Sequence, residues 1–372
     1  MYLNSSSAEE IVKKIIDLEI SDNEIAMILL ASEEQTDVNE LISELNNYGI
    51  EFVGGIFPGL ISGKEVYHSG AILQIFPLLE KPILVKGLDS QDFEIPPFEG
   101  KIFEDTGKKK TVLILLDGMA ENITQLLHRT FNYLGNSVNY LGGGAGFMHY
   151  AKKPCIFTPE GFFQDAAIIV PIDMETGLGV RHGLEFVSGP VIVTRSNNHA
   201  IQELNWKNAY LEYKEIIEKA TNKQWSDTEF QNLMDDFAFG IYCKDREYIA
   251  RVTTKVTEKG ELICPGGMPE NAALSILRTE KEKMLAASSK AASEAINPEK
   301  NLRNTLIVDC YGRSMFFNDE FNTELSSIFG ELEKVDEKAI LEGVLSVGEI
   351  SSYIDGILEF FNYTAVVGCF YE

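Results

Sequence analysis

The sequence predicts an α/β protein of two lobes, in which mixed, largely antiparallel sheets are flanked by helices. Two observations lead to this class. Short apolar runs of strand length alternate with amphipathic helical patterns along the whole chain. The length of 372 residues favours two domains, at roughly 100–200 residues for each.

In the first half, helices alternate with buried strands. Ile11, Ile15 and Ile16 recur among charged residues, as expected on one face of an amphipathic helix over 8–18. Asp37 suits the N-cap of a second helix, over 38–47. A third helix is expected over 120–134, and apolar runs give strands over 25–31, 51–63 (ending in a glycine-rich turn), 71–76, 82–85 and 111–116, of which 71–76 and 82–85 pair.

Residues 138–195 have an all-β pattern, with short strands between Gly, Pro and Asp turns, and we expect a meander or sandwich there. Beyond them the expected helices are 210–220, 227–234, 271–296 and 320–329, and the expected strands are 237–242, 248–254, 262–264, 306–309, 344–350 and 364–370. The change from strands to helices places the domain boundary between 210 and 211, giving domains 1–210 and 211–372. No Pro/Ser linker marks it, so the halves should share an interface, and no short-period repeat is evident.

Composition excludes several classes of function. The net charge of −25 argues against nucleic-acid binding and against docking on anionic lipid, since both need clustered cations. Apolar runs are too short to span a membrane, and the N-terminal residues lack a secretory pattern. The five cysteines are widely spaced and never form CxxC, which indicates reduced thiols in a cytoplasmic protein.

Familiar catalytic motifs are missing from the sequence. The segment 141–147 lacks the GxGxxG spacing, 62–70 is not a P-loop, and no GxSxG elbow occurs. The five histidines never have HxxxH spacing, so no metal site is supported. We therefore predict no catalytic residues and no enzymatic activity.

Four segments carry functional information: VNYLGGGAGF (138–147), VDCYGR (308–313), LSVGEISS (345–352) and FNYTAVVGC (361–369). The N–H groups at Gly143 and Gly144 could meet an anion, or the glycines could simply form a tight turn. Arg313 offers a planar, fixed-charge fork suited to a carboxylate. Asn362 and Thr364 alternate onto one face of the last strand.

In this order, the four segments resemble the FIST family, which has an N-terminal and a C-terminal FIST region. Further matches are FVGGIFPG (52–59), GLGVRHGLEFVSGPVIVTR (177–195), YIARVTTK around Arg251 and GGMPENAAL (266–274), so the resemblance covers roughly 20–370. It implies a sensory domain in signal transduction that binds a small ligand, an amino acid or a related metabolite. Phe147 stands where many members have an acidic residue, which puts a cation role in doubt.

Many FIST members are fused to kinase, cyclase or chemoreceptor output modules. The resemblance leaves no part of this chain for such a module. We therefore expect a cytoplasmic sensory protein that signals in trans, to a separate output protein.

The ligand site can be sketched from these residues. Arg313 would hold a ligand carboxylate by two hydrogen bonds, and Glu349, with Asn362 and Thr364, would receive its ammonium group. Alternatively, Arg313 and Glu349 form an internal ion pair with each other. Arg251 would supply a second positive group, or form a salt bridge. The candidate ligand-binding residues are Arg313, Glu349, Asn362, Thr364, Arg251, Cys310, Gly143 and Gly144.

Two alternatives from other classes remain open. One is an enzyme using Cys310 or the Arg313/Glu349 pair, although no histidine lies near Cys310 in the sequence to act as its base, and a small core residue is the simpler interpretation. The other is a haem-based nitric-oxide sensor, as described for some FIST members. His182, next to Arg181, would then be the axial ligand, with His149 as second choice. No other cofactor and no metal ion is expected.

Overall fold

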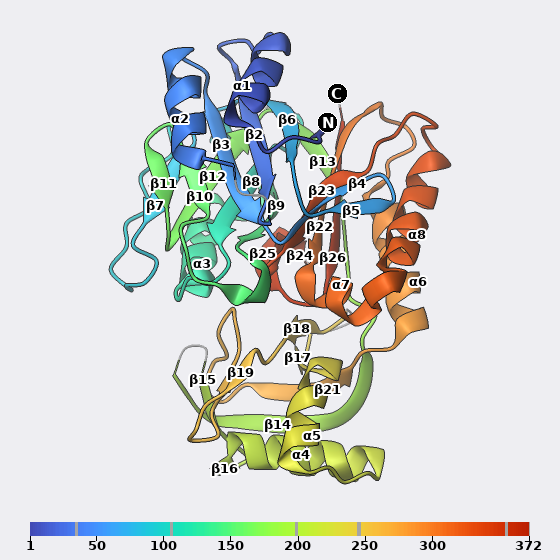
Figure 1. Ribbon diagram of the computed structural model, residues 1–372. Coiled ribbons are helices and arrows are strands. Elements are labelled where there is room, and N and C mark those ends of the chain that lie inside the picture. The colour runs from blue at the N-terminus through green and yellow to red at the C-terminus, as the bar shows by residue number, and fades with distance from the viewer. Residues whose placement is uncertain (34–35, 105–106, 198–199, 244–246, 354–355, 372) are drawn as a thin grey trace.

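The computed structural model describes residues 1–33, 36–104, 107–197, 200–243, 247–353 and 356–371. They form a main body and a small lobe (Figure 1). The small lobe comprises the described residues of 185–279, and the main body comprises those before and after it. The predicted class, a two-lobed α/β protein with mostly antiparallel mixed sheets, is confirmed.

The elements before the small lobe are β1 (Tyr2–Leu3), α1 (Ala8–Asp17), β2 (Glu24–Ala31), α2 (Val38–Asn47), β3 (Phe52–Phe57), β4 (Gly59–Ser62), β5 (Glu65–Tyr67), β6 (Ala71–Pro77), β7 (Ile83–Lys86), η1 (Lys101–Phe103), β8 (Thr111–Asp117), α3 (Ile123–Leu134), β9 (Asn139–Ala145), η2 (Met148–Tyr150), β10 (Ile156–Thr158), β11 (Gly161–Phe163), β12 (Ala166–Ile172) and β13 (Glu175–Arg181). The small lobe contains β14 (Glu185–Asn197), β15 (Ala200–Leu204), β16 (Lys207–Asn208), α4 (Ala209–Thr221), α5 (Asp227–Leu233), η3 (Met234–Asp236), β17 (Phe237–Ile241), β18 (Ile249–Arg251), β19 (Lys255–Val256), β20 (Leu262–Ile263) and β21 (Ala273–Arg278). The main body resumes with α6 (Lys281–Ala295), β22 (Leu302–Cys310), α7 (Tyr311–Phe317), η4 (Asn318–Glu320), α8 (Phe321–Glu333), β23 (Glu342–Ser346), β24 (Glu349–Tyr353), β25 (Ile357–Phe361) and β26 (Ala365–Tyr371).

The main body repeats one topology three times within the described residues. Each unit has a strand, a helical segment, a parallel strand, a hairpin and a last strand antiparallel to the first. The units are β2–β6, β8–β12 and β22–β26. Each hairpin leaves its own unit: β4–β5 pairs with β23, β10–β11 with β3, and β24–β25 with β9. Each unit thus gives its hairpin to the sheet of another unit, and the three exchanges form a closed cycle. No short-period pattern in the sequence indicates this repeated topology.

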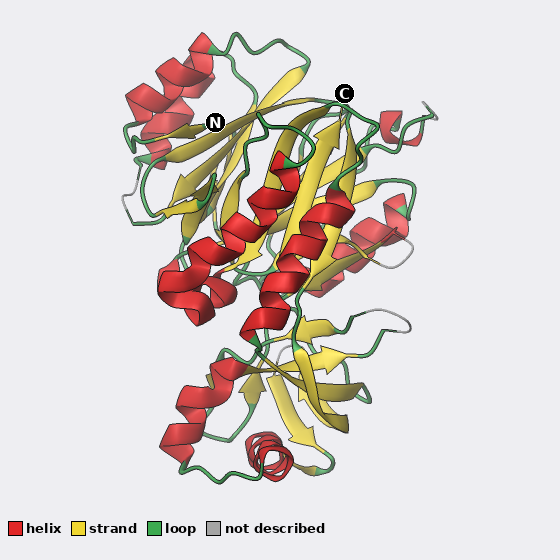
Figure 2. Ribbon diagram, turned by 90° about the vertical axis from the view of Figure 1, so that its right-hand side faces the viewer, coloured by secondary structure: helices red, strands yellow, loops and turns green. Residues whose placement is uncertain are grey.

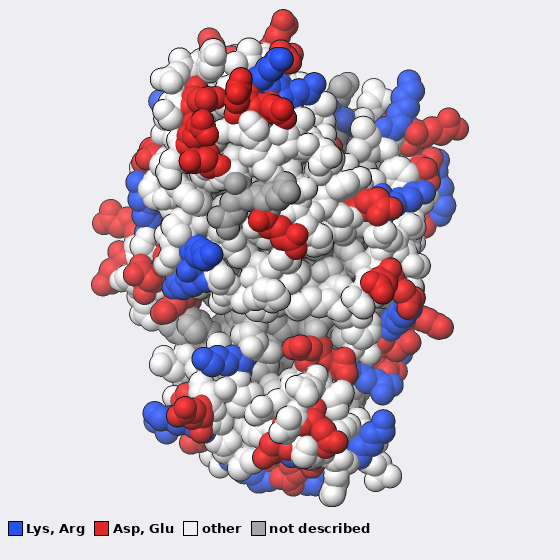
Figure 3. Space-filling model, in the orientation of Figure 1, with Lys and Arg blue, Asp and Glu red and all other residues white. Residues whose placement is uncertain are grey.

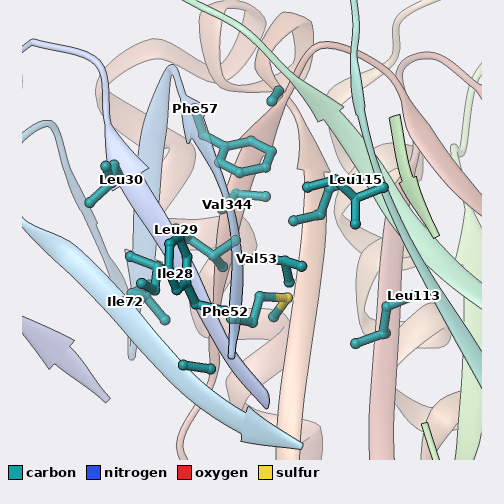
Figure 4. Close-up of a cluster of buried hydrophobic side chains, with 14 of the residues drawn as sticks. Ile28, Leu29, Leu30, Phe52, Val53, Phe57, Ile72, Leu113, Leu115 and Val344 are labelled. Atoms are coloured by element: carbon teal, nitrogen blue, oxygen red, sulfur yellow. The ribbon is translucent and has the colours of Figure 1, made fainter. Parts of the chain in front are cut away.

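The three sheets enclose a shared core (Figure 4). On β8, Leu113 and Leu115 face this core, while Val112 and Ile114 face outward against α3, as the two-residue period of a strand requires. α6 and α8 lie together over the outer face of the sheet that contains β22 and β26 (Figure 2).

The small lobe is an antiparallel sheet with its own core. The strand order is β18-β17-β21-β14-β15-β20-β19, and β16 pairs with β15. Tyr213 of α4 and Phe230 of α5 pack against Phe239 of β17. Because β14–β16 precede residue 210 and β17–β21 follow it, one sheet contains strands from both sides of the predicted boundary.

Three local predictions were wrong. Residues 138–195 do not form one meander, because their strands enter four different sheets. The strands near 71–76 and 82–85 do not pair: β6 pairs with β1 and β2, whereas β7 pairs with β12. The expected helix over 271–296 begins only at Lys281, since 273–278 form β21 between β14 and β17, and the Glu280 side chain caps α6 by accepting from the N–H of Lys283.

Candidate functional site

A cavity of about 240 Å³ lies where the small lobe meets the main body. The small lobe contributes Asp235, Val252, Thr253, Thr254 and Pro265, and the main body contributes His149, Tyr150, Cys310, Tyr311, Gly312, Met315, Ser346, Val347, Gly348, Asn362 and Tyr363. His149, Asp235 and Met315 are exposed and form its rim, whereas Ser346, Gly348 and Asn362 are buried. The cavity therefore joins segments that are far apart in sequence.

Three turns of the main body shape the cavity. Cys310 ends β22 and Tyr311 begins α7 at once. Val347 and Gly348 connect β23 to β24. Gly348 has φ +95°, and a Cβ there would lie 2.0 Å from the Phe360 ring, so both the conformation and the space require glycine. Asn362 and Tyr363 belong to the turn between β25 and β26, and the Asn362 side-chain oxygen accepts a hydrogen bond from the Val252 N–H, 3.2 Å away, which links the main body to the small lobe.

Three residues that line this cavity have a left-handed backbone conformation, out of ten such non-glycine residues in the part of the chain that the structure describes. His149, Tyr150 and Tyr363 have φ values of 59°, 56° and 54°, in the left-handed region that residues with a Cβ rarely adopt. All three line the cavity. Such strain persists where the surrounding structure imposes it, and it clusters at functional sites.

Glu349 lies directly beneath the cavity floor. Its carboxyl group is fully buried and accepts hydrogen bonds from the Ser346 hydroxyl at 2.7 Å, from the Thr364 N–H at 3.2 Å and from the Cys310 thiol. Burial raises the pKa of Glu349 to about 8, so the group is largely protonated at neutral pH. Burial and the nearby Glu349 also raise the pKa of Cys310 well above its usual value. At neutral pH both groups are hydrogen-bonded acids rather than a thiolate and its base.

Arg313 does not face the cavity. Its side chain is fully buried, and its guanidinium donates to the carbonyl oxygens of His182 and Tyr363 at 2.7 and 2.8 Å, to Ser288 at 2.8 Å and to the Glu324 carboxylate. Protein acceptors thus surround the guanidinium. Arg313 therefore has a structural ion pair, and its partner is Glu324 rather than Glu349.

Asp309 lies beside this ion pair. Its carboxyl oxygen is 3.4 Å from Nε of Arg313, and neither of its oxygens accepts a hydrogen bond in the part of the chain that the structure describes. Burial, followed by the charge of Glu324, raises its pKa well above the usual value. A protonated Asp309 leaves one positive and one negative charge, on Arg313 and Glu324, which balance each other.

Arg251 borders a different cavity, of about 650 Å³. Its guanidinium donates to the carbonyl oxygen of Phe360 at 2.6 Å and to the Glu359 carboxylate at 3.0 Å. The loop at Gly266 and the first turns of α3 complete this second cavity. The structure therefore separates Arg251 from Cys310, Glu349 and Asn362.

The glycine segment packs closely within the sheet. The Gly144 N–H donates to Gly348, its carbonyl accepts from Val347, both at 2.8 Å, and a Cβ at Gly144 would lie 2.1 Å from the Val347 carbonyl oxygen. Gly143 pairs with Glu349 in the neighbouring strand. These glycines allow the close approach of two chain segments, which agrees with the tight-packing alternative. Thr364 uses its hydroxyl to bond the Asn362 carbonyl oxygen at 2.9 Å.

The surroundings of His182 do not fit haem. Only 4% of the residue is exposed, its Nδ1 accepts the Leu184 N–H at 2.8 Å, and its carbonyl oxygen binds Arg313. Burial lowers its pKa. Among the described residues, His182 lines neither of the two cavities described above. Arg181 is engaged with Glu294.

Sequence reasoning missed the small-lobe wall and the aromatic residues of the cavity. Asp235 lies outside every motif, and only the topology brings it to Cys310. Thr253 lies in the quoted segment YIARVTTK but was not chosen as a ligand-binding residue. Ser346 and Tyr363 lie inside the quoted motifs LSVGEISS and FNYTAVVGC, but neither was chosen as a ligand-binding residue. Tyr150 follows the glycine-rich segment and gave no signal of its own.

Comparison with protein-family models identifies two known domains in this chain. The FIST N domain matches residues 25–207, and the FIST C domain matches residues 209–352. The chain belongs to the FIST family. FIST domains are associated with sensory roles in signal transduction, and both of them contribute to the cavity, through His149 and Tyr150 on one side and Cys310 and Ser346 on the other. A search of curated proteins finds no significant match.

Two searches of the described residues gave negative results. No helix among them has the length and apolar character needed to cross a membrane. Nor do three of their His, Cys, Asp or Glu side chains group in a way that could hold a metal ion.

Proposed function

We propose that this FIST protein is a sensory protein whose small ligand, an amino acid or related metabolite, binds in the cavity between the main body and the small lobe. The observation that carries the proposal is the convergence of both lobes and three strained residues, His149, Tyr150 and Tyr363, on one partly enclosed space. A ligand that contacts both lobes favours the arrangement of the lobes that binds it best. A partner protein that recognises that arrangement can then detect the ligand.

We further propose that the signal passes in trans to a separate output protein, and that the protein is cytoplasmic. In the part of the chain that the structure describes, the strands outside the two matched regions, β1, β25 and β26, complete the sheets of the main body. The widely spaced cysteines, all free in the structure, support a reducing compartment. Acidic and basic side chains are interspersed on the face shown in Figure 3, which supports a partner other than nucleic acid.

We propose no catalytic activity. A cysteine nucleophile needs a lowered pKa, and the environment of Cys310 has the opposite effect. Its carboxyl neighbour, Glu349, is itself held in the protonated form by burial.

The test is a thermal-shift panel of amino acids and related metabolites. A ligand at about 100 times its dissociation constant adds about 2.7 kcal/mol to the free energy of unfolding. The panel is run on wild type, on Tyr150→Ala in the cavity and on Tyr48→Ala, an exposed tyrosine outside it. We expect a shift with wild type and Tyr48→Ala and its loss in folded Tyr150→Ala. A shift that survives in Tyr150→Ala would place the ligand elsewhere.

A further inference from the structure

The cavity between the lobes has an unbalanced set of charges. Asp235 brings a carboxylate to its rim, and none of the described residues that line it is a lysine or arginine. The two arginines that the sequence offered for a ligand carboxylate are absent from it: protein acceptors surround Arg313, and Arg251 borders the other cavity beside Glu359. A carboxylate entering this space would find no cationic partner among them.

Aromatic rings form much of the remaining wall. Tyr150, Tyr311 and Tyr363 all line the cavity, and the rings of Tyr150 and Tyr311 meet edge to face with centroids 6.0 Å apart. The Tyr150 hydroxyl lies within electrostatic range of both Asp235 and Glu349. Aromatic faces attract ammonium groups, most strongly where water is excluded, and an ionised carboxylate nearby, such as that of Asp235, strengthens that attraction.

We propose that the cavity between the lobes binds a small organic amine in its ammonium form and discriminates against the amino acid that carries the same amine. The ammonium group would lie among the tyrosine rings with Asp235 as its counter-ion. The α-carboxylate of the parent amino acid would lose water without gaining a cation, and Asp235 would repel it. This inference rests on the proposed function, since it narrows the ligand class of the same site.

The experiment uses pairs of compounds that differ only by a carboxylate: putrescine and ornithine, cadaverine and lysine, tyramine and tyrosine. Each is titrated calorimetrically into the full chain at pH 7.5. For at least one pair, we expect the dissociation constant of the amine to be at least about tenfold lower than that of the amino acid. This ratio corresponds to about 1.4 kcal/mol of binding free energy.

Neighbouring aspartates provide a matched pair of variants. Asp235→Asn removes the rim carboxylate, and Asp236→Asn changes the next residue, which borders a different cavity, one that also includes Trp225 and Phe316. Because Asp235 is exposed, its removal should weaken amine binding by about two- to fivefold. Asp236→Asn should leave amine affinity within error of wild type.

The outcomes separate the inference from the proposed function. If an amino acid binds as tightly as its amine, or more tightly, and Tyr150→Ala abolishes that binding, the inference is wrong while the proposed function stands. If Asp235→Asn leaves amine affinity unchanged, the inference is also wrong. If neither amines nor amino acids bind, both are contradicted.

Discussion

The two sides of the short helix α7 behave differently, although one motif, VDCYGR, encodes both. On one side, Arg313 is buried among protein acceptors and a carboxylate partner. On the other side, three residues earlier, Cys310 borders a cavity that both lobes share. A recognisable motif therefore contains one residue that stabilises the fold and another that faces the site. A choice of ligand-binding residues by charge alone selects Arg313, which does not line the cavity.

The largest expected effect is that of Arg313→Ala. The variant leaves the buried Glu324 carboxyl without its cationic partner, and should lower the free energy of unfolding by about 3–5 kcal/mol. Urea denaturation measures this change. Arg195→Ala, which alters an arginine with 64% of its side chain exposed, should change stability by less than about 0.5 kcal/mol. If Arg313→Ala has normal stability but no longer binds the ligand, Arg313 contacts the ligand and its structural role is wrong.

A glycine pair gives the next largest effect. Gly348→Ala puts a Cβ 2.0 Å from the Phe360 ring at a φ of +95°, and we expect a loss of about 1–3 kcal/mol. Gly330→Ala lies in α8 with nothing within 4 Å of its new Cβ, and should raise stability by up to about 1 kcal/mol. Equal effects in the two variants would mean that the turn below the cavity is not constrained as described.

Glu349 gives the cavity side of α7 a pH dependence. Its pKa is about 8 in the folded state, above the ordinary value of 4.5, so the folded state holds a proton that the unfolded state has lost. Its contribution is therefore fully present below about pH 4.5 and disappears as pH rises towards 8, by at most about 1.4 kcal/mol per pH unit. We expect Glu349→Gln to flatten the stability–pH curve across that range. If the difference in the free energy of unfolding between wild type and Glu349→Gln does not change with pH, the raised pKa of Glu349 is wrong.

The smallest effect concerns thiol reactivity. Cys310 is 6% exposed, with a strongly raised pKa, whereas Cys243 is half-buried. At pH 7, iodoacetamide should modify Cys243 before Cys310, as followed by peptide mass spectrometry. Preferential modification of Cys310 would support the enzyme alternative.

Sequence reasoning recovered the fold class and most elements, because the buried strands are continuous apolar runs and the helices carry clear caps and apolar faces. It could not recover the pairing of strands: three hairpins leave their own units for another sheet, and no local pattern encodes that exchange. For the same reason it assigned Arg251 to the ligand site as a second positive group, although Arg251 borders the second cavity.

The candidate site was recovered in part. Cys310 and Asn362 line the cavity and Glu349 lies beneath it. Cys310 ends β22 in one sheet, whereas Glu349 begins β24 and Asn362 follows β25 in another sheet. Asp235 comes from a lobe inserted into the main body, and only the three-dimensional contact makes it part of the site.

The central claim is that the ligand binds between the lobes, and hydrogen–deuterium exchange with and without the best ligand of the panels tests it most directly. We predict protection in both lobes at once, at 252–254 of the small lobe and at 310–316, 346–348 and 362–363 of the main body. Protection confined to the loop at Gly266 and the start of α3 would assign the ligand to the second cavity and contradict the account.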